Sequence, residues 1–292
     1  MKVLVLGKNG MLGHVVYNYF KDLGIETYGT VSHENGVDIL FDANENMKSI
    51  EKTLEKLKPT VVINCIGILN SVAENNKALA VKLNSLLPHY MDNLSNEYNF
   101  KFVHVSTDCV FEGNVGKYDE TSRPDATSFY GRSKALGEIK NNKNVTLRTS
   151  IVGPDNNENA IGLFKWFITQ TGTVNGYTKV IWTGVTTIEL AKAIKMAIDN
   201  NLCGLHHVVN NNFIAKKDLL ELFKKFFEKD INIENDDTIS CEKTLVRTKI
   251  SYDFNVPTYE NMICEMKDWV LNHKDLYPLI FENCELGVEK KR

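Results

Sequence analysis

The sequence predicts an α/β protein with a doubly wound parallel sheet and a smaller C-terminal α/β lobe. Short apolar runs rich in Val and Ile alternate with helical patterns through the first half of the chain. A glycine-rich turn follows the first run, and polar side chains end a later one. Alternating strands and helices favour a parallel sheet, because parallel neighbours need helical crossovers.

The expected elements of the sheet follow one another from the N-terminus. Runs of apolar, β-branched residues predict strands, which lie at 2–6, 26–30, 60–66, 102–106 and 145–152. Apolar residues at helical spacing predict helices, which lie near 15–20, at 47–57, at about 78–98 and from 130 onward. The series therefore predicts helices on both faces of the sheet.

The regular alternation of strand and helix patterns ends after Gly153, where a second lobe is expected. Its elements are a polar loop at 155–159, a helix at 163–167, a glycine-containing stretch at 171–177, and helices near 217–227 and 260–272. A helix at 187–199 and a strand at 205–210 restore the earlier rhythm and are assigned to the sheet. The expected domains are 1–152 plus about 183–212, and about 153–182 plus 213–292, with 285–292 as a frayed tail.

Composition excludes several classes of protein. The 292 residues carry a net charge of -3, and no basic field that would attract nucleic acid. Lys216–Lys217 and Lys224–Lys225 are expected on solvated helix faces. No apolar run reaches the roughly 18 residues of a membrane span, and the apolar N-terminal run is too short for a signal peptide. We therefore expect a cytoplasmic enzyme that binds neither nucleic acid nor a membrane.

The metal-binding residue types show no recognisable spacing. The six cysteines are scattered without a C-x-x-C pair, so we expect free thiols rather than disulfides or a zinc site. His206 and His207 are adjacent on an expected strand and would face opposite sides. We expect no metal.

Three glycines mark the first strand-to-helix turn, GKNGMLG. Glycine permits a tight turn, a close approach of pyrophosphate to the backbone, and close packing of helix on strand, while the helix N-terminus attracts the anion. The position at the first βα junction favours a dinucleotide site over an ordinary turn. The residues expected to contact the cofactor here are Gly7, Lys8, Asn9, Gly10, Met11, Leu12 and Gly13.

The end of the second strand bears on the choice of nicotinamide cofactor. An NAD-selective site places an acid about 20 residues after the glycines, to bind the ribose 2′-hydroxyl. Here the strand leads to Ser32 and His33, with no carboxylate before Glu34. Together with Lys8 these residues would tolerate a 2′-phosphate. We therefore expect NADPH, with NADH as the alternative.

Two features predict catalytic chemistry. Tyr130 and Lys134 are four residues apart at the start of an expected helix, so they share one face, and an ammonium can stabilise a phenolate. The strand at 102–105 leads into Ser106 and Thr107, whose hydroxyls would lie at the ligand-binding edge of the sheet. Taken alone, the Tyr–Lys spacing is common by chance and fits an exposed Tyr with a surface Lys, and Ser106 and Thr107 alone would fit a strand-end cap.

Taken together the motifs are more specific. GKNGMLG, VINCIG, VSTDCVF and YGRSK, in this order, resemble the extended short-chain dehydrogenase/reductases, whose sheet is a Rossmann fold, and most closely their dTDP-4-dehydrorhamnose reductase branch. RTSIVG and WTGVTTIELA extend the resemblance over nearly the whole chain. The chain departs from that branch at Cys109, where a Tyr is usual.

The resemblance implies roles for individual residues. Thr107 would orient the keto group, Tyr130 would be the general acid, and Lys134 would bind the nicotinamide ribose and lower the pKa of the phenol. Asn84 would support the active-site helix. Other implied cofactor contacts are Asp42, Cys65, Ile66, Gly67, Asn84 and Tyr130, and the expected substrate contacts are Thr107, Asp108, Cys109, Val110 and Tyr130. Arg247 is a candidate to clamp a diphosphate, or to form a surface ion pair.

The implied reaction is NAD(P)H-dependent reduction of the C4 keto group of a nucleotide-linked 4-keto-6-deoxy sugar, for surface polysaccharide precursors. The nucleotide, dTDP or UDP, and the sugar, 4-keto-rhamnose or a 2-acetamido relative, stay open, as does a homodimer. Two rival hypotheses are a non-catalytic NADP-binding regulatory subunit and a bifunctional epimerase/reductase that uses Cys109. The loop at 153–156 holds no His that would serve such an epimerase as a second acid/base.

Overall fold

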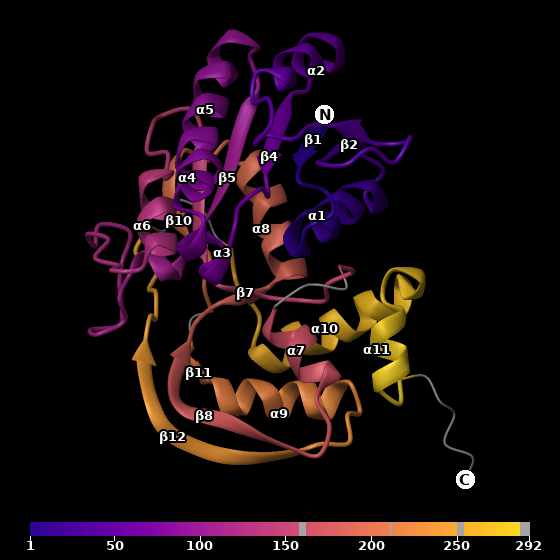
Figure 1. Cartoon of the computed structure of the whole chain (residues 1–292), viewed down its shortest axis with the longest axis vertical. Helices are drawn as coiled ribbons and strands as arrows, with labels where there is room; N and C mark the ends of the chain where they lie inside the picture. The colour runs from indigo at the N-terminus through magenta and orange to yellow at the C-terminus, as the bar shows by residue number, and fades with distance from the viewer. Residues whose placement is uncertain (158–161, 211, 250–253, 287–292) are drawn as a thin grey trace.

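Seven parallel strands form the larger sheet of the computed structural model, in the upper half of Figure 1. The structure describes residues 1–157, 162–210, 212–249 and 254–286. The strand order is β10-β6-β5-β4-β1-β2-β3. The strands are β1 Lys2–Leu6, β2 Glu26–Val31, β3 Ile39–Leu40, β4 Val61–Asn64, β5 Lys101–Thr107, β6 Val145–Thr149 and β10 Gly204–His207. The order reverses at β1, between β2 and β4, and such a reversal opens a crevice at the carboxyl ends of the strands.

Helices cover both faces of this sheet, which confirms the doubly wound fold. Val3 and Val5 belong to a core shared with α1 and α8, whereas Leu4 and Leu6 belong to a core shared with α2 and α5. Alternate residues of one strand thus enter two different cores. The helices of this domain are α1 Met11–Asp22, α2 Ser49–Leu57, α3 Asn70–Asn75, α4 Lys77–Ala80, α5 Leu87–Glu97, α6 Phe129–Leu136 and α8 Thr187–Asp199.

The helix expected at about 78–98 is not one continuous α-helix. A π-helical segment, η1 Val81–Leu86, joins α4 to α5. Asn84 lies fully buried in this segment, and its side chain bonds both backbone groups of Ile68, so the wider turn brings the amide to the loop after β4. Segments of this kind are frequent at functional sites.

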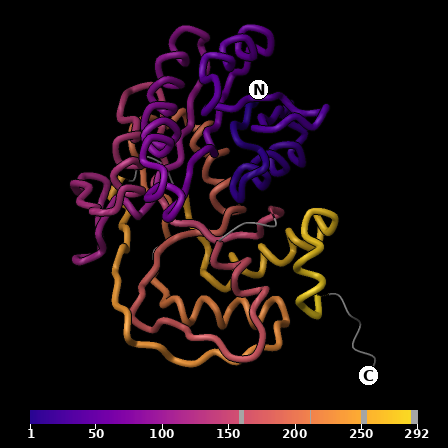
Figure 2. Tube along the Cα trace, viewed as in Figure 1, coloured from indigo at the N-terminus to yellow at the C-terminus, as the bar shows by residue number. Residues whose placement is uncertain are grey.

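The smaller lobe holds a separate three-stranded sheet in the order β11-β8-β12. β8 Thr173–Trp182 and β12 Asn232–Glu242 run parallel, and the trace in Figure 2 follows them along the lower edge of the molecule. The other elements are β11 Ile214–Ala215, α7 Leu163–Thr169, α9 Lys216–Phe226, α10 Tyr259–Asn272, the short helix η3 Lys274–Leu276 and α11 Pro278–Asn283. The expected combination of a parallel sheet and a smaller C-terminal α/β lobe is confirmed.

Two expectations about individual segments were wrong, and one strand was missed. Residues 171–177, expected as a loose glycine-containing stretch, lead into the long strand β8, and β12 was not expected at all. The strand expected at 145–152 is interrupted after Thr149, and Ile151–Val152 forms β7, which pairs with β9 Val185–Thr186 instead. Of the expected tail, 287–292 lie outside the described residues. The domain boundaries stay a prediction.

No helix in the described part of the chain is both long and apolar enough to span a membrane.

A buried ion pair ties the catalytic edge of the sheet together. Arg148 on β6 binds Glu138, just after α6, through two contacts of 2.8 and 2.7 Å, and both side chains are fully buried. Glu138 also accepts a hydrogen bond of 2.9 Å from Ser106 on β5. Arg148 contacts the Nε2 atom of His207 on β10 at 3.1 Å. The pair thus joins three adjacent strands to the end of α6.

We expect Arg148→Met to lower the free energy of unfolding by about 3–5 kcal/mol, because it leaves the Glu138 carboxylate buried without its partner. The matched control is Lys195→Met, which removes the ion pair with Asp199 on the outer face of α8 and should cost less than about 1 kcal/mol. Urea unfolding of both variants measures the difference. Equal losses would contradict a structural role for the buried pair.

Candidate active site

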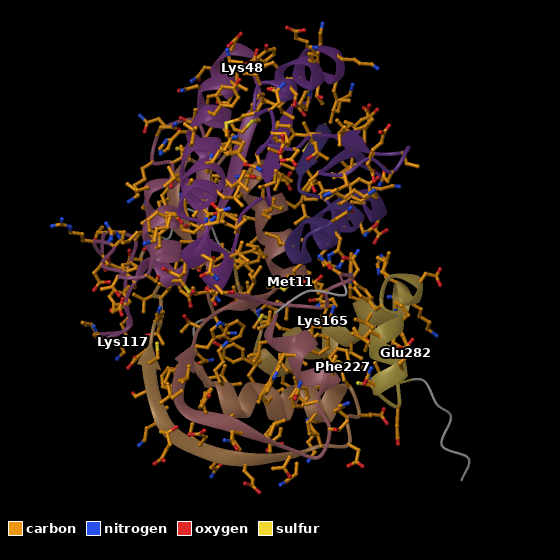
Figure 3. All side chains as sticks on the ribbon, viewed as in Figure 1. Met11, Lys48, Lys117, Lys165, Phe227 and Glu282 are labelled. Carbon is orange, nitrogen blue, oxygen red and sulfur yellow. The ribbon has the colours of Figure 1, made fainter. Side chains whose placement is uncertain are left out.

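A cleft of about 600 Å³ opens at the carboxyl ends of β1, β4, β5 and β6. Met11, at the start of α1, lies between the two lobes in Figure 3, and a Cβ on Gly162 would come within 3.2 Å of its sulfur. The predicted site residues on the cleft wall are Gly10, Met11, Leu12, Cys65, Ile66, Gly67, Thr107, Asp108, Cys109, Tyr130 and Lys134. Those away from the wall are Gly7, Lys8, Asn9, Gly13, Ser32, His33, Asp42, Asn84, Val110 and Arg247.

The glycine-rich turn has the geometry that the sequence predicted. Gly7 has a φ of +76°, which favours glycine, and a Cβ there would lie 2.9 Å from Ile66. A Cβ on Gly13 would lie 2.0 Å from the carbonyl oxygen of Gly7. A side chain at Gly13 would push α1 away from the turn, whereas one at Gly7 would press against the loop after β4. The glycines therefore place the N-terminus of α1 against the cleft, where free N–H groups favour an anion.

The surroundings of Lys8 differ from the expectation. Its ammonium lies 2.6 Å from the carboxylate of Asp38, and its stem occupies the space in front of Gly29, where a Cβ would lie 2.5 Å from the lysine Cδ. Burial raises the pKa of Asp38, but hydrogen bonds from Lys8 and Asn35 outweigh this and hold the pKa below its usual value. Asp38, in the loop after β2, thus places a carboxylate near the end of that strand. It lies farther along the chain than the roughly 20 residues after the glycines at which an acid was expected.

Three other residues expected near the adenosine lie outside the cleft. Ser32 and His33 are exposed and contact each other at 2.9 Å. Asp42 accepts hydrogen bonds from the backbone N–H groups of Asn44 and Glu45, so its carboxylate stabilises a local turn. Their roles in cofactor binding stay predictions.

Tyr130 reaches the cleft because α6 begins immediately before it. The Ser128 hydroxyl caps the helix by accepting from the N–H of Gly131 at 3.1 Å. A Cβ on Gly131 would lie 2.1 Å from the carbonyl oxygen of Cys109, so glycine allows α6 to pack against the short 3₁₀ helix Asp108–Val110. The phenol of Tyr130 and the hydroxyl of Thr107 then share one wall of the cleft.

The phenol of Tyr130 stays protonated in this environment. Burial raises the pKa of Tyr130 far above its usual value, Cys109 adds to the shift, and a hydrogen bond with Thr107 opposes it. Burial lowers the pKa of Lys134 to about 8, against the effect of Glu138. The Lys134 ammonium donates to the carbonyl of Val105 at 2.7 Å, and its role toward the phenol stays a prediction.

Asn84 and Gly67 lie close to Lys134 and connect three segments around it. The Asn84 amide donates to the Ser133 hydroxyl and to the carbonyl of Ile68, each at 3.0 Å. A Cβ on Gly67 would lie 3.2 Å from the Asn84 oxygen and 3.9 Å from the Lys134 nitrogen. The π-helical segment is therefore bound directly to α6 and to the loop after β4, although Asn84 itself does not line the cleft.

Two of the expected substrate contacts do not line the cleft in this structure. Val110 is fully buried and packs with Phe111 and Leu245, so it cannot touch a ligand in the cleft. Arg247 donates to the carbonyl of Phe254 at 2.5 Å and does not lie on the cleft wall. A diphosphate clamp by Arg247 therefore has no support from its position.

Other cleft residues were missed in the sequence. Thr149, Ser150 and Ile151 follow β6, so the rule that ligands meet strand ends would have found them. Asp155 also lines the cleft, and burial raises its pKa. No local pattern marked it.

Lys216 was wrongly expected on a solvated helix face. It is half-buried, and its ammonium lies 4.8 Å from the centre of the Trp182 ring. Burial lowers the pKa of Lys216 to about 8, while Asp108 raises it. The smaller lobe therefore presents a cation to the acid that follows Thr107.

No group of three or more His, Cys, Asp or Glu side chains in the described ranges is arranged to hold a metal ion. His207 contacts Arg148, whereas His206 contacts the carbonyl of Cys203.

Comparisons with known proteins agree with this architecture. A probable low-salt glycan biosynthesis reductase from Haloferax volcanii is 26% identical over 88% of this chain and 86% of its own length. Methionine adenosyltransferase 2 subunit beta from Danio rerio is 29% identical, over 47% of this chain and 42% of its own length. The crystal structure of dTDP-4-dehydrorhamnose reductase from Bacillus anthracis in complex with NADP superposes with a TM-score of 0.78, at 20% identity, over 91% of this chain and 98% of that one.

The model of the RmlD substrate-binding domain family matches residues 1–252, which is most of the chain. This match covers both the glycine-rich turn and the wall that holds Thr107, Tyr130 and Lys134. The protein belongs to the RmlD substrate-binding domain family, within the extended short-chain dehydrogenases/reductases.

Proposed function

We propose that the protein uses NAD(P)H to reduce the C4 keto group of a dTDP- or UDP-linked 4-keto-6-deoxy sugar, in the synthesis of surface polysaccharide precursors. The observation that carries the proposal is the shared cleft. Its wall joins the N-terminus of α1 to Thr107, Tyr130 and Lys134. The glycan biosynthesis reductase and the dTDP-4-dehydrorhamnose reductase among the related proteins support this choice of substrate class.

The residues at the glycine-rich turn fit a dinucleotide. Gly7 and Gly13 allow the close approach of α1 to the first strand, and Gly10, Met11 and Leu12 line the cleft. These groups would hold the pyrophosphate, and Gly67 leaves room beside Lys134 for the ribose. When bound, NAD(P)H supplies the hydride that becomes the new hydrogen on the sugar carbon.

The chain's own residues supply and hold the proton. The neutral phenol of Tyr130 would donate its proton to the carbonyl oxygen as that oxygen gains negative charge, which yields the alcohol. The Thr107 hydroxyl, next to the phenol, would orient the oxygen. Lys134 would turn from the Val105 carbonyl to the ribose and the phenol, and its charge would stabilise the phenolate left behind.

The smaller lobe would hold the rest of the substrate. Lys216, at the start of α9, interacts electrostatically with Asp108, so the smaller lobe places a cation beside an acid of the cleft wall. Burial raises the pKa of Cys109 to about 12, with a further contribution from Asp108. A neutral thiol is a poor base for epimerisation, so we favour a reductase without epimerase activity. A homodimer stays a prediction.

We expect Tyr130→Phe to lower kcat about 10²–10⁴-fold with the best substrate of a panel of dTDP- and UDP-linked 4-keto-6-deoxy sugars, because the proton donor is lost. Cofactor oxidation measures the rate, and cofactor affinity should change little. Tyr98→Phe, at the end of α5 and away from the cleft, is the control and should keep the wild-type rate. A wild-type protein that binds cofactor tightly but reduces no member of the panel would favour the regulatory-subunit hypothesis.

The ion pair between Lys8 and Asp38 leads to a separate prediction about the preference for NADPH over NADH. We expect NADPH to be preferred through Lys8, and the preference to be limited because a 2′-phosphate competes with Asp38 for the ammonium. Asp38→Asn should therefore raise the ratio of kcat/KM for NADPH to that for NADH by about tenfold. Lys8→Met should lower the same ratio. A fall in the ratio for Asp38→Asn would contradict this arrangement of charges.

A further inference from the structure

Three hydrogen bonds connect the C-terminal helices to the glycine-rich turn. The indole N–H of Trp269, on α10, donates to the hydroxyl of Tyr277 at 2.9 Å. The same hydroxyl lies 2.8 Å from Nε2 of His14, on α1. The Nδ1 atom of His14 lies 3.0 Å from the carbonyl oxygen of Gly10. The chain of contacts therefore begins in the smaller lobe and ends at a residue of the cleft wall.

The direction of each hydrogen bond follows from burial. His14 and Tyr277 are 2% and 1% exposed. Burial lowers the pKa of His14 to about 4, against a bond to Gly10 and with a further lowering by His273, so the ring is neutral near pH 7. The Gly10 carbonyl only accepts, so Nδ1 carries the proton and Nε2 accepts from the Tyr277 hydroxyl. Tyr277 in turn accepts from Trp269, and every polar atom in the chain has a partner.

A second contact holds the other end of α1. His273 follows α10, stacks on the Trp269 ring with centres 4.0 Å apart, and contacts Asp22 at 3.1 Å. Asp22 is the last residue of α1. Figure 1 shows α10 and α11 below α1, in agreement with contacts at both of its ends. The C-terminal segment thus contacts α1 near both of its ends.

The carbonyl of Gly10 accepts from both the backbone N–H and the ring of His14, and it shares a peptide group with Met11, a residue of the cleft wall. The peptide between Gly10 and Met11 is planar and trans, so its C=O and its N–H point in opposite directions. A hydrogen bond that fixes the Gly10 oxygen therefore also fixes the N–H of Met11, in the turn that lines the cleft. Gly10 is the N-cap residue of α1 and has no side chain that could cap the helix. The ring of His14 instead contacts the Gly10 carbonyl oxygen.

We infer that Tyr277 is a positioning residue for the cofactor. Through His14 it orients the peptide after Gly10, so the affinity of the turn for the pyrophosphate depends on a side chain of the smaller lobe. The inference rests on the proposed binding of NAD(P)H at this turn. It adds a residue that does not line the cleft and touches neither the cofactor nor the substrate.

The test compares two buried tyrosines of the smaller lobe. Tyr277→Phe keeps the ring but removes the hydroxyl from His14, and should raise the Kd for NADPH, measured by fluorescence titration, roughly five- to tenfold. At saturating cofactor, kcat and the KM for the sugar nucleotide should stay within about twofold of wild type. Tyr259→Phe is the matched control, because its hydroxyl contacts the carbonyls of Trp182 and Asn212 and no part of α1. Its Kd for NADPH should equal that of wild type.

His14→Leu tests the same link from the other side and provides a second variant. It should weaken NADPH binding by a similar factor, and adding Tyr277→Phe to it should weaken binding no further, because both changes break one chain of contacts. A wild-type Kd for Tyr277→Phe, equal weakening by Tyr259→Phe, or additive effects of His14→Leu and Tyr277→Phe would each overturn the inference. A wild-type chain that binds neither NADPH nor NADH would instead refute the proposed function.

Discussion

The close approach of α1 to the first strand is the constraint on which the site depends. The carbonyl of Gly7 occupies the space that a side chain on Gly13 would need, 2.0 Å from the position of its Cβ. Only glycine lets the helix begin this close to the strand end. The N-terminus of α1 therefore lies on the cleft, where the strand order reverses and where Tyr130 is also placed.

The catalytic wall is built by a second close approach. Gly131 lets α6 contact the backbone of Cys109, and this contact aligns the phenol with the end of β5. Beneath it, Glu138 binds Arg148 and the hydroxyl of Ser106, so the residue before Thr107 and the residues after α6 are held by one ion pair. The proton donor and the hydroxyl are thus positioned by backbone contacts and buried charge.

Local patterns were enough to predict the strands of the sheet and several parts of the cleft wall. Strand runs and helix spacing are short-range signals, and the carboxyl ends of parallel strands meet at one edge wherever the strands lie in the chain. The glycine-rich turn, the end of β5 and the start of α6 were therefore placed from the sequence. Ser106 and Asn84 were recognised as well, but their bonds to Glu138 and Ser133 were not.

The features that sequence reasoning missed depend on contacts between distant residues. Lys8 and Asp38 are separated by 30 positions, and His14 and Tyr277 by 263. Lys216 lies in a Lys-rich helix start that is indistinguishable from a solvated face until β8 brings Trp182 beside it. The interpretation of Arg247 had the same weakness. Its charge suits a diphosphate, but the fold places it away from the cleft wall. Charge and spacing alone carry no information about which lobe a side chain will face.

The central claim is transfer of hydride to the sugar carbon in the cleft formed by α1 and α6. The most direct measurement uses NADPH that carries deuterium at both C4 positions of the nicotinamide, with the preferred keto-sugar nucleotide, followed by mass spectrometry and NMR of the product. The account predicts one deuterium per turnover, on C4 of the sugar, with the hydroxyl hydrogen taken from solvent. Deuterium at another carbon, or cofactor oxidation without deuterium in the sugar, would contradict it.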